Sequence, residues 1–168
     1  MKLSSVREKK FTDAYNSYSD ALFRFCFFRI FDRERAKELM QEAFTRSWDY
    51  VRRGNDIKNI RAFLYKTARH LIIDEARKKS NAYKEDIDTC EERLAVPAKQ
   101  ELDIDIGLAY DALKKLDEPC REAVTLRFVE GFSPKEIAAM VGESENVVSV
   151  RIHRGILKLR ALLLHNDP

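Results

Sequence analysis

The sequence contains few of the residues on which fibrous, low-complexity or membrane-spanning proteins depend. Only 5 glycines and 4 prolines occur among 168 residues, which excludes a collagen-like or low-complexity chain. No apolar run approaches the ~20 residues that a membrane-spanning helix needs. No apolar stretch follows the N-terminal lysine, as a secretory signal would require. These absences predict a cytoplasmic protein without membrane insertion.

The sequence also lacks the patterns of a metal site or a catalytic centre. Its three cysteines, Cys26, Cys90 and Cys120, lie far apart, without a C-x-x-C pair or a nearby histidine. An odd count without spacing argues against disulfides and zinc, so reduced thiols are expected. The five glycines form no phosphate-binding loop, and the three histidines have no triad spacing. We therefore expect no catalytic residue, no metal, no cofactor and no enzymatic activity.

Charge is unevenly distributed along the chain. Residues 1–79 carry 19 Lys and Arg against 11 Asp and Glu, a balance of +8. Residues 80–106 carry 3 against 8, a balance of −5, and residues 107–168 carry 9 of each sign. A basic first part favours polyanion binding there, although solvated helix faces would also account for charge.

Helical periodicity dominates the chain, and no convincing alternating strand is present. The sequence predicts an all-α fold of two small helical domains, at 1–80 and 107–168, joined by a flexible acidic linker at 81–106. In the first domain we expect three helices. The first covers about 10–31, the second begins at an N-cap at Asp32, and the third covers about 60–79. In the second domain the expected helices cover about 107–116, 119–130, 133–141 and 144–165.

The most specific local pattern lies at residues 133–152. Ser133 is placed to cap a helix with Glu136 at its third position, and Gly142 suits a tight turn. Ser144 then caps a second helix whose Val148 faces the core, which is the spacing of a helix-turn-helix. The expected buried stripe of that helix is Val148, Ile152, Ile156, Leu159 and Leu163.

The opposite side of this second helix carries polar residues near its N-terminus, where major-groove readout requires them. An unrelated helical hairpin with solvated side chains is the alternative. The residues expected to project outward are Asn146, Ser149, Val150 and His153, flanked by Arg154 and Arg160.

The helix at 60–79 mixes cations with aromatic residues, which suits single-stranded nucleic acid. Phe63 and Tyr65 could instead belong to the core. The residues expected opposite its apolar stripe are Arg61, Tyr65, Lys66, Arg69 and Arg77, with Phe63, His70 and Asp74 near one boundary.

The helix that follows Asp32 carries a carboxylate patch beside its apolar stripe, formed by Glu38, Gln41 and Glu42. Carboxylates are poor DNA contacts, so this patch predicts a protein docking face. Ordinary pairing of charges along the helix is the alternative.

Together these segments resemble the extracytoplasmic-function (ECF) sigma factors over nearly the whole chain. DRERAKELMQEAF (32–44) is similar to region 2.2, which binds core RNA polymerase. IRAFLYKTARHLIIDEARKK (60–79) resembles regions 2.3 and 2.4, which open and read the −10 element. Residues 116–164 resemble region 4, which reads the duplex −35 element. The resemblance implies a sigma factor that directs promoter recognition, strand opening and initiation, and usually an anti-sigma partner.

The resemblance also implies residue roles. Asp32, Glu38, Gln41 and Glu42 match polymerase-docking positions. Phe63, Tyr65, Arg69, His70 and Asp74 match the −10 segment, while Arg127, Ser149, Val150, Arg151, His153 and Arg154 match the −35 surface. Members usually have Asn where this chain has His70, and often a basic residue at Ser149 and a small polar one at Val150.

Three other classes remain to be distinguished. A stand-alone helix-turn-helix repressor or activator would bind duplex operators without polymerase, but it leaves the basic aromatic helix and the carboxylate patch without a role. An RNA-binding regulator is a further alternative. An enzyme would need the catalytic or phosphate-binding patterns that the sequence lacks.

Overall fold

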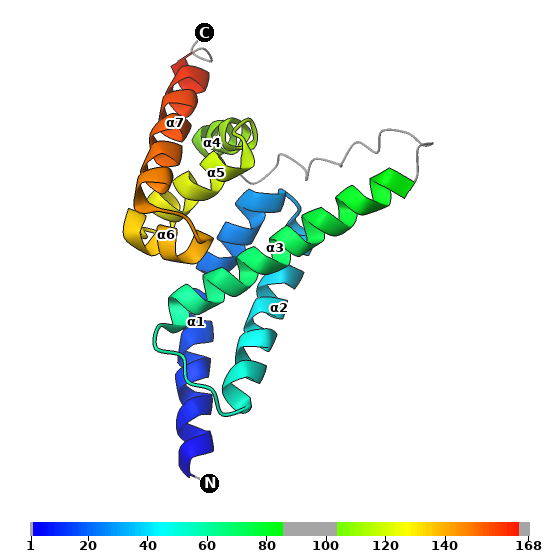
Figure 1. Cartoon of the computed structure of the whole chain (residues 1–168), viewed down its shortest axis with the longest axis vertical. Helices are drawn as coiled ribbons and strands as arrows, with labels where there is room; N and C mark the ends of the chain where they lie inside the picture. Colours follow the sequence, from blue (N-terminus) through cyan, green and yellow to red (C-terminus); the bar gives the residue numbers. More distant parts are fainter. Residues whose placement is uncertain (1, 86–103, 165–168) are drawn as a thin grey trace.

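The computed structural model describes residues 2–85 and 104–164, and within these ranges it contains helices and no strand. The predicted all-α fold is confirmed. The elements, shown in Figure 1, are α1 (Lys2–Ile30), α2 (Arg33–Arg52), α3 (Ile60–Glu85), α4 (Ile104–Lys114), α5 (Glu118–Val124), the π-helical turn η1 (Thr125–Val129), α6 (Pro134–Val141) and α7 (Glu145–Leu164).

Helices α1, α2 and α3 form one packed unit, which we call the head bundle. Figure 1 shows α1 and α2 side by side, with α3 crossing them diagonally. The Asp32 side chain accepts a hydrogen bond from the Arg35 backbone N–H at 3.0 Å, so the predicted N-cap of α2 is confirmed. The core of the bundle includes Leu22, Phe25 and Leu64, each with no exposed surface.

Helices α4 to α7 and η1 form the second unit, the tail bundle. Its centre is the crossing of α5 and α7, where Gly155 is buried. A Cβ at Gly155 would lie 2.5 Å from Cγ2 of Val124, so only glycine lets the two helices approach this closely. The sequence analysis did not identify this residue, because periodicity gives no measure of how near a neighbouring helix lies.

The predicted helix-turn-helix is present in the tail bundle as α6, Gly142 and α7. Ser133 and Glu136 form a complete capping box, and hydrogen bonding from Ser133 holds the Glu136 pKa below its usual value. Gly142 has φ 73°, the left-handed conformation that ends α6, and its N–H donates to the Ala138 carbonyl at 3.0 Å. The Ser144 hydroxyl accepts from the Val147 N–H at 3.2 Å and so begins α7.

Several predicted boundaries differ from the structure. α1 begins well before residue 10, α3 continues to Glu85, and α4 begins at Ile104, so helix enters both ends of the predicted 81–106 linker. The predicted 119–130 helix is α5 followed by the π-helical turn. Leu163, predicted to be buried, is 44% exposed because the tail bundle does not extend to the end of α7. The rest of the linker, 86–103, lies outside the described residues.

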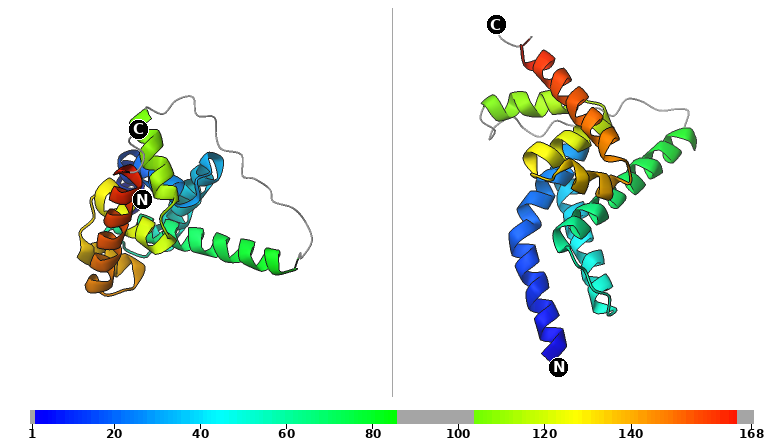
Figure 2. Two further views of the ribbon diagram at one scale, coloured as in Figure 1. Left: turned by 90° about the horizontal axis from the view of Figure 1, so that it is seen from above. Right: turned by 60° about the vertical axis from the view of Figure 1, so that its left-hand side comes forward.

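The two bundles pack against each other. α1 contacts α4, α5 and η1, while α3 contacts α6. Figure 2 shows the tail bundle seated across one end of α1 and against α3. Leu126, Phe132 and Ile137 of the tail bundle join the same apolar core as the head-bundle residues.

The link between α1 and α2 belongs to this contact. Phe31 has φ 54°, a conformation that non-glycine residues seldom adopt. Its ring packs edge-on against Tyr110 of α4, with centroids 5.0 Å apart, and the Arg121 guanidinium lies 5.0 Å from the ring centroid. Contacts from the tail bundle therefore help to hold the head-bundle link in its unusual conformation.

Two of the thiols agree with the prediction of reduced cysteines. Cys26 and Cys120 are free and buried. Burial raises the pKa of the Cys26 thiol to about 12, and burial also raises that of Cys120. Both act as small apolar side chains in their bundles, and Cys90 lies outside the described residues.

The close α5–α7 crossing makes Gly155 a sensitive position. Overpacking costs about 1–3 kcal/mol, whereas alanine recovers up to about 1 kcal/mol of helix propensity. We expect Gly155→Ala to lower the free energy of unfolding by a net ~1–2 kcal/mol. Gly107→Ala is the matched control, since its Cβ would meet nothing within 4 Å. Urea titration of both variants tests this, and equal stability of the two would contradict the crossing.

Candidate nucleic-acid and polymerase interfaces

The first candidate surface is the outer face of α7. Asn146, Ser149, His153 and Arg154 are exposed, and Val150 is 40% exposed. The packed side of the helix is formed by Val148 and Gly155, which are buried. The helical phasing predicted for the N-terminal half of α7 is therefore confirmed.

Two arginines beside this face are already engaged within the tail bundle. Arg151 is half-buried and pairs with Glu143 at 2.9 Å. Arg127 lies on η1, is exposed, and donates from Nη1 to the Phe132 carbonyl at 3.2 Å. Arg154 lies on α7 and Arg127 lies on η1, and both of these elements contact α6.

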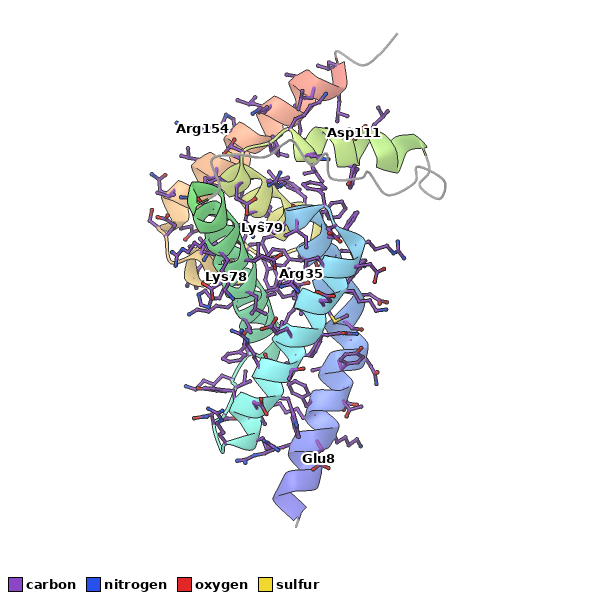
Figure 3. The ribbon with its side chains drawn as sticks, turned by 90° about the vertical axis from the view of Figure 1, so that its right-hand side faces the viewer. Glu8, Arg35, Lys78, Lys79, Asp111 and Arg154 are labelled. Carbon is purple, nitrogen blue, oxygen red and sulfur yellow. The ribbon has the colours of Figure 1, made fainter. Side chains whose placement is uncertain are left out.

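The second candidate surface is the exposed part of α3. Lys66 and Arg77 are exposed, as predicted for the face opposite the apolar stripe, and so are His70 and Asp74, which were predicted near its boundary. Figure 3 shows Lys78 and Lys79 continuing along the same helix. Phe63 is half-buried, and its ring lies 5.0 Å from that of Tyr50, which is 41% exposed. This part of α3 offers cations beside a partly accessible aromatic pair.

Tyr65 lies elsewhere, and its predicted exposure is wrong. It is 1% exposed, with its ring 5.2 Å from Phe25 and 4.9 Å from Phe132. Its hydroxyl donates to Oε2 of Glu130 at 2.5 Å. Desolvation raises the Tyr65 pKa above its usual value, with the Glu130 charge as the second cause. The alternative that Tyr65 belongs to the core describes the structure, because the tail bundle covers this side of α3.

Arg61 and Arg69 also face the tail bundle. The Arg61 guanidinium donates to the Glu130 carbonyl and lies 3.9 Å from the Phe132 ring centroid. Arg69 donates from Nε to Oε1 of Glu122 at 2.8 Å. Both arginines are half-buried, so the structure divides the predicted −10 residues between two surroundings.

The sequence analysis missed the residues that complete this contact. Arg29 of α1 donates from Nη1 to Oε1 of Glu122 at 2.5 Å and also pairs with Glu118. The Arg29 and Glu122 side chains are only 2% and 6% exposed. Glu130 is also buried, and desolvation raises its pKa above the usual value. A cation within the apolar run of α1 was the one sequence signal for a buried ion pair.

A charged cleft of about 660 Å³ borders this contact. The cleft lies between the C-terminal half of α3, the end of α1 and α5. The charged groups on its wall include Arg69, Arg77, Lys79, Glu75, Glu118 and Arg151.

The third candidate surface is the carboxylate patch of α2. Glu38 pairs with Arg35 at 2.5 Å, Glu42 pairs with Arg46 at 2.6 Å, and Gln41 is exposed. Charge pairing along the helix, the alternative given above, is therefore present. Exposed pairs of this kind contribute little to stability, typically ~0–1 kcal/mol, so the carboxylates remain available to a protein partner. Asp32 is occupied as the N-cap.

Comparison with known proteins gives matches over both bundles. The model of sigma-70 region 2 matches residues 14–82, and that of sigma-70 region 4 matches residues 106–159. Among the described residues no helix combines the length and apolar character needed to cross a membrane.

Curated relatives align along nearly the whole chain. The ECF RNA polymerase sigma factor SigX of Bacillus subtilis is 28% identical over 161 residues, covering 91% of this chain and 83% of SigX. SigL of Mycobacterium tuberculosis is 27% identical, covering 89% of this chain and 86% of SigL. BldN of Streptomyces coelicolor is also 27% identical, but the aligned part is 58% of its length.

Solved structures share the fold. The sigma factor RpoE of Bartonella quintana, in complex with the anti-sigma factor NepR, has a TM-score of 0.80 and 24% identity, over 95% of this chain and 99% of that chain. CnrH, in complex with the cytosolic domain of CnrY, has a TM-score of 0.70 and 24% identity, over 95% and 91%.

The two sigma-70 regions match in order and together cover well over half of the chain, and SigX and SigL align with the chain over most of their own lengths. The helix-turn-helix and the basic α3 lie where those two regions match. This chain therefore belongs to the ECF RNA polymerase sigma factors of the two-domain type, with regions 2 and 4.

Proposed function

We propose that this protein binds core RNA polymerase and directs promoter recognition, strand opening and transcription initiation at a specific set of promoters. The observation that carries the proposal is the succession of sigma-70 regions 2 and 4 on two helical bundles, each with an exposed surface suited to nucleic acid. The protein acts as an initiation factor and not as an enzyme. Sequencing the 5′ ends of transcripts made by core polymerase with this protein tests the function. Transcripts identical to those of core polymerase alone would contradict it.

We infer that residues 1–80 serve as region 2 and residues 107–168 as region 4, with 81–106 spanning between the −10 and −35 elements. In region 2, the exposed cations Lys66 and Arg77 neutralise phosphates, and the Phe63 ring stacks on a base of the single-stranded −10 element. Arg61, Tyr65, Arg69, His70 and Asp74 complete the −10 set. Of these five residues, Arg61, Tyr65 and Arg69 face the tail bundle, so they reach DNA only when that bundle moves away.

Region 4 carries the −35 contacts. Exposed polar side chains at the N-terminus of α7 match the geometry of a recognition helix in the major groove. Ser149, Val150 and His153 are proposed to choose the sequence, with the Val150 side chain available to a thymine methyl. Arg127, Arg151 and Arg154 are proposed to position the helix on phosphates, while Asn146 lies at its first turn.

Partners beyond polymerase and promoter DNA follow from the family. RpoE is solved with an anti-sigma factor. We propose that an anti-sigma factor regulates this protein. We also propose a cytoplasmic location, because core polymerase and promoter DNA are found there.

Polymerase docking is tested by reversing the charge of the α2 patch. The triple variant Glu38→Lys, Gln41→Lys, Glu42→Lys should abolish co-purification with core polymerase, because three cations replace the two carboxylates and the amide of the proposed docking face. All three residues lie outside the buried stripe of α2, so helicity should be unchanged.

The matched control is Asp13→Lys, Asn16→Lys, Asp20→Lys on α1. It makes the same change in charge at three exposed positions of the same bundle. Retained co-purification of the α2 triple variant, with both variants folded, would move the polymerase interface elsewhere.

Upstream recognition is tested on α7. Arg154→Ala should lower transcription from all dependent promoters to a similar degree if the arginine holds a phosphate. Ser149→Arg adds a long cation at a base-facing position, so it should change which −35 sequences are preferred. Lys158→Ala, one turn after Arg154 and also exposed, serves as the control.

The measurement is a selection from randomised −35 elements by polymerase carrying each variant. A selected motif that is the same for wild type and Ser149→Arg would show that Ser149 does not face the bases.

A further inference from the structure

The functions proposed above give no role to the charged cleft between α3, the end of α1 and α5. Its volume of about 660 Å³ lies within the ~300–1,000 Å³ range that is usual for small-molecule sites. Both bundles form its wall, to which α3 contributes Arg69, Arg77 and Lys79, and the tail bundle contributes Arg121 and Arg151. The cleft is therefore a site of ligand size at the junction of the two bundles.

The wall of the cleft carries more positive than negative charge. Six of its side chains are cations and four are carboxylates, a formal balance of +2. Each of the four carboxylates is already paired with a cation. The pairs are Glu75 with Arg35 and Lys79, Glu118 with Arg29 and Arg121, Glu122 with Arg29 and Arg69, and Glu143 with Arg151. The negative groups are thus satisfied, and the excess charge in the cleft is positive.

Several cationic donors of the wall remain available to a ligand. Within the described part of the chain, Arg77 is exposed and its side chain makes no hydrogen bond or ion pair. Among the same residues Arg69 makes one hydrogen bond, from Nε to Glu122, so its Nη groups are unused. The Lys79 ammonium lies 3.4 Å from the Glu75 carboxylate, and the Lys79 side chain is 65% exposed. Guanidinium and ammonium groups with free donors suit phosphate oxygens.

An apolar strip separates the two arginines along α3. Ile73 lies one turn after Arg69, and Arg77 lies one turn after Ile73, so the arginines are about 12 Å apart along the helix axis. Ala76 also lines the cleft from α3, and Pro119 of α5 lines it from the other bundle. Both of these side chains are exposed. The cleft therefore combines phosphate-binding donors with an accessible apolar surface.

We propose that this cleft binds a nucleoside di- or triphosphate, with the phosphate chain held by the free donors of α3 and the base resting on the apolar strip. The free cations exceed what a single phosphate needs, which favours a chain of two or three phosphates over a monophosphate. A nucleotide in the cleft and the −10 strand would share Arg69 and Arg77, so the two would compete. The nucleotide site itself does not depend on the promoter functions proposed above.

Fluorescence anisotropy of N-methylanthraniloyl-ATP with the full-length chain tests the site. We expect saturable binding that unlabelled ATP displaces. AMP should displace the probe at least about tenfold less well, because it lacks two of the phosphates that the free cations would hold. Neither polymerase nor promoter DNA is present, so failure of this test leaves the proposed function untouched.

Lys79→Ala should weaken binding of the probe about fivefold or more, because it removes a phosphate donor. Lys78→Ala is the matched control: it removes the same charge at the neighbouring exposed position of α3, which does not line the cleft. Figure 3 labels both lysines on this helix. Ala76→Glu places a carboxylate on the apolar strip and should weaken binding more than about tenfold. Because Ala76 is exposed and glutamate is a good helix former, circular dichroism should be unchanged.

Four results would contradict the nucleotide site. The first is the absence of saturable binding by the wild-type chain. The second is equal weakening by Lys78→Ala and Lys79→Ala, which would mean general attraction to a basic helix. The third is displacement of the probe by a thymidine 20-mer but not by ATP, which would assign the phosphate chemistry to a nucleic-acid strand. The fourth is displacement by pyrophosphate as effective as that by ATP, since the nucleoside would then contribute nothing.

Discussion

The buried ion pair between Arg29 and Glu122 is the constraint on which the arrangement of the two bundles depends. Both side chains lie almost wholly out of water, so each needs the other to offset the loss of its hydration. Arg69 gives Glu122 a second cation, and Glu118 gives Arg29 a second carboxylate. A pair of this kind adds little to net stability compared with apolar packing, but it strongly disfavours any docking geometry that separates the charges.

The rest of the contact follows from that placement. Glu122 is held against α1 and α3. The chain that follows η1 then places Glu130 beside Tyr65 and Phe132 beside Arg61, both on α3. Tyr65 then satisfies its hydroxyl with the Glu130 carboxylate, while its ring joins Phe25 and Phe132 in a shared core. The π-helical turn matters here because an interrupted α-helix redirects the chain just before α6. The apolar and the polar contacts therefore favour the same docked geometry. One Glu130 oxygen remains without a hydrogen-bond partner within the described part of the chain.

The same contact connects structure with function. Three of the residues proposed for the −10 element, Arg61, Tyr65 and Arg69, meet groups of the tail bundle at this contact. The α7 surface proposed for the −35 element and the carboxylate patch on α2 stay exposed while the two bundles are packed together.

The sequence by itself determined the features that depend on neighbours in the chain. The N-cap at Asp32, the capping box of Ser133 and Glu136 and the left-handed Gly142 could all be predicted, because each is satisfied within about four residues. The exposed polar face at the start of α7 followed from helical periodicity for the same reason.

Tertiary structure decided what covers each face. Periodicity placed Tyr65 opposite the apolar stripe of α3, but it carried no information about a second bundle that buries that side. Glu122, Glu130 and Gly155 gave no local signal, because their importance comes from groups on other helices: Arg29 and Arg69, Tyr65, and Val124. A local pattern specifies which way a side chain points along its own helix, and only the packed chain specifies what it meets there.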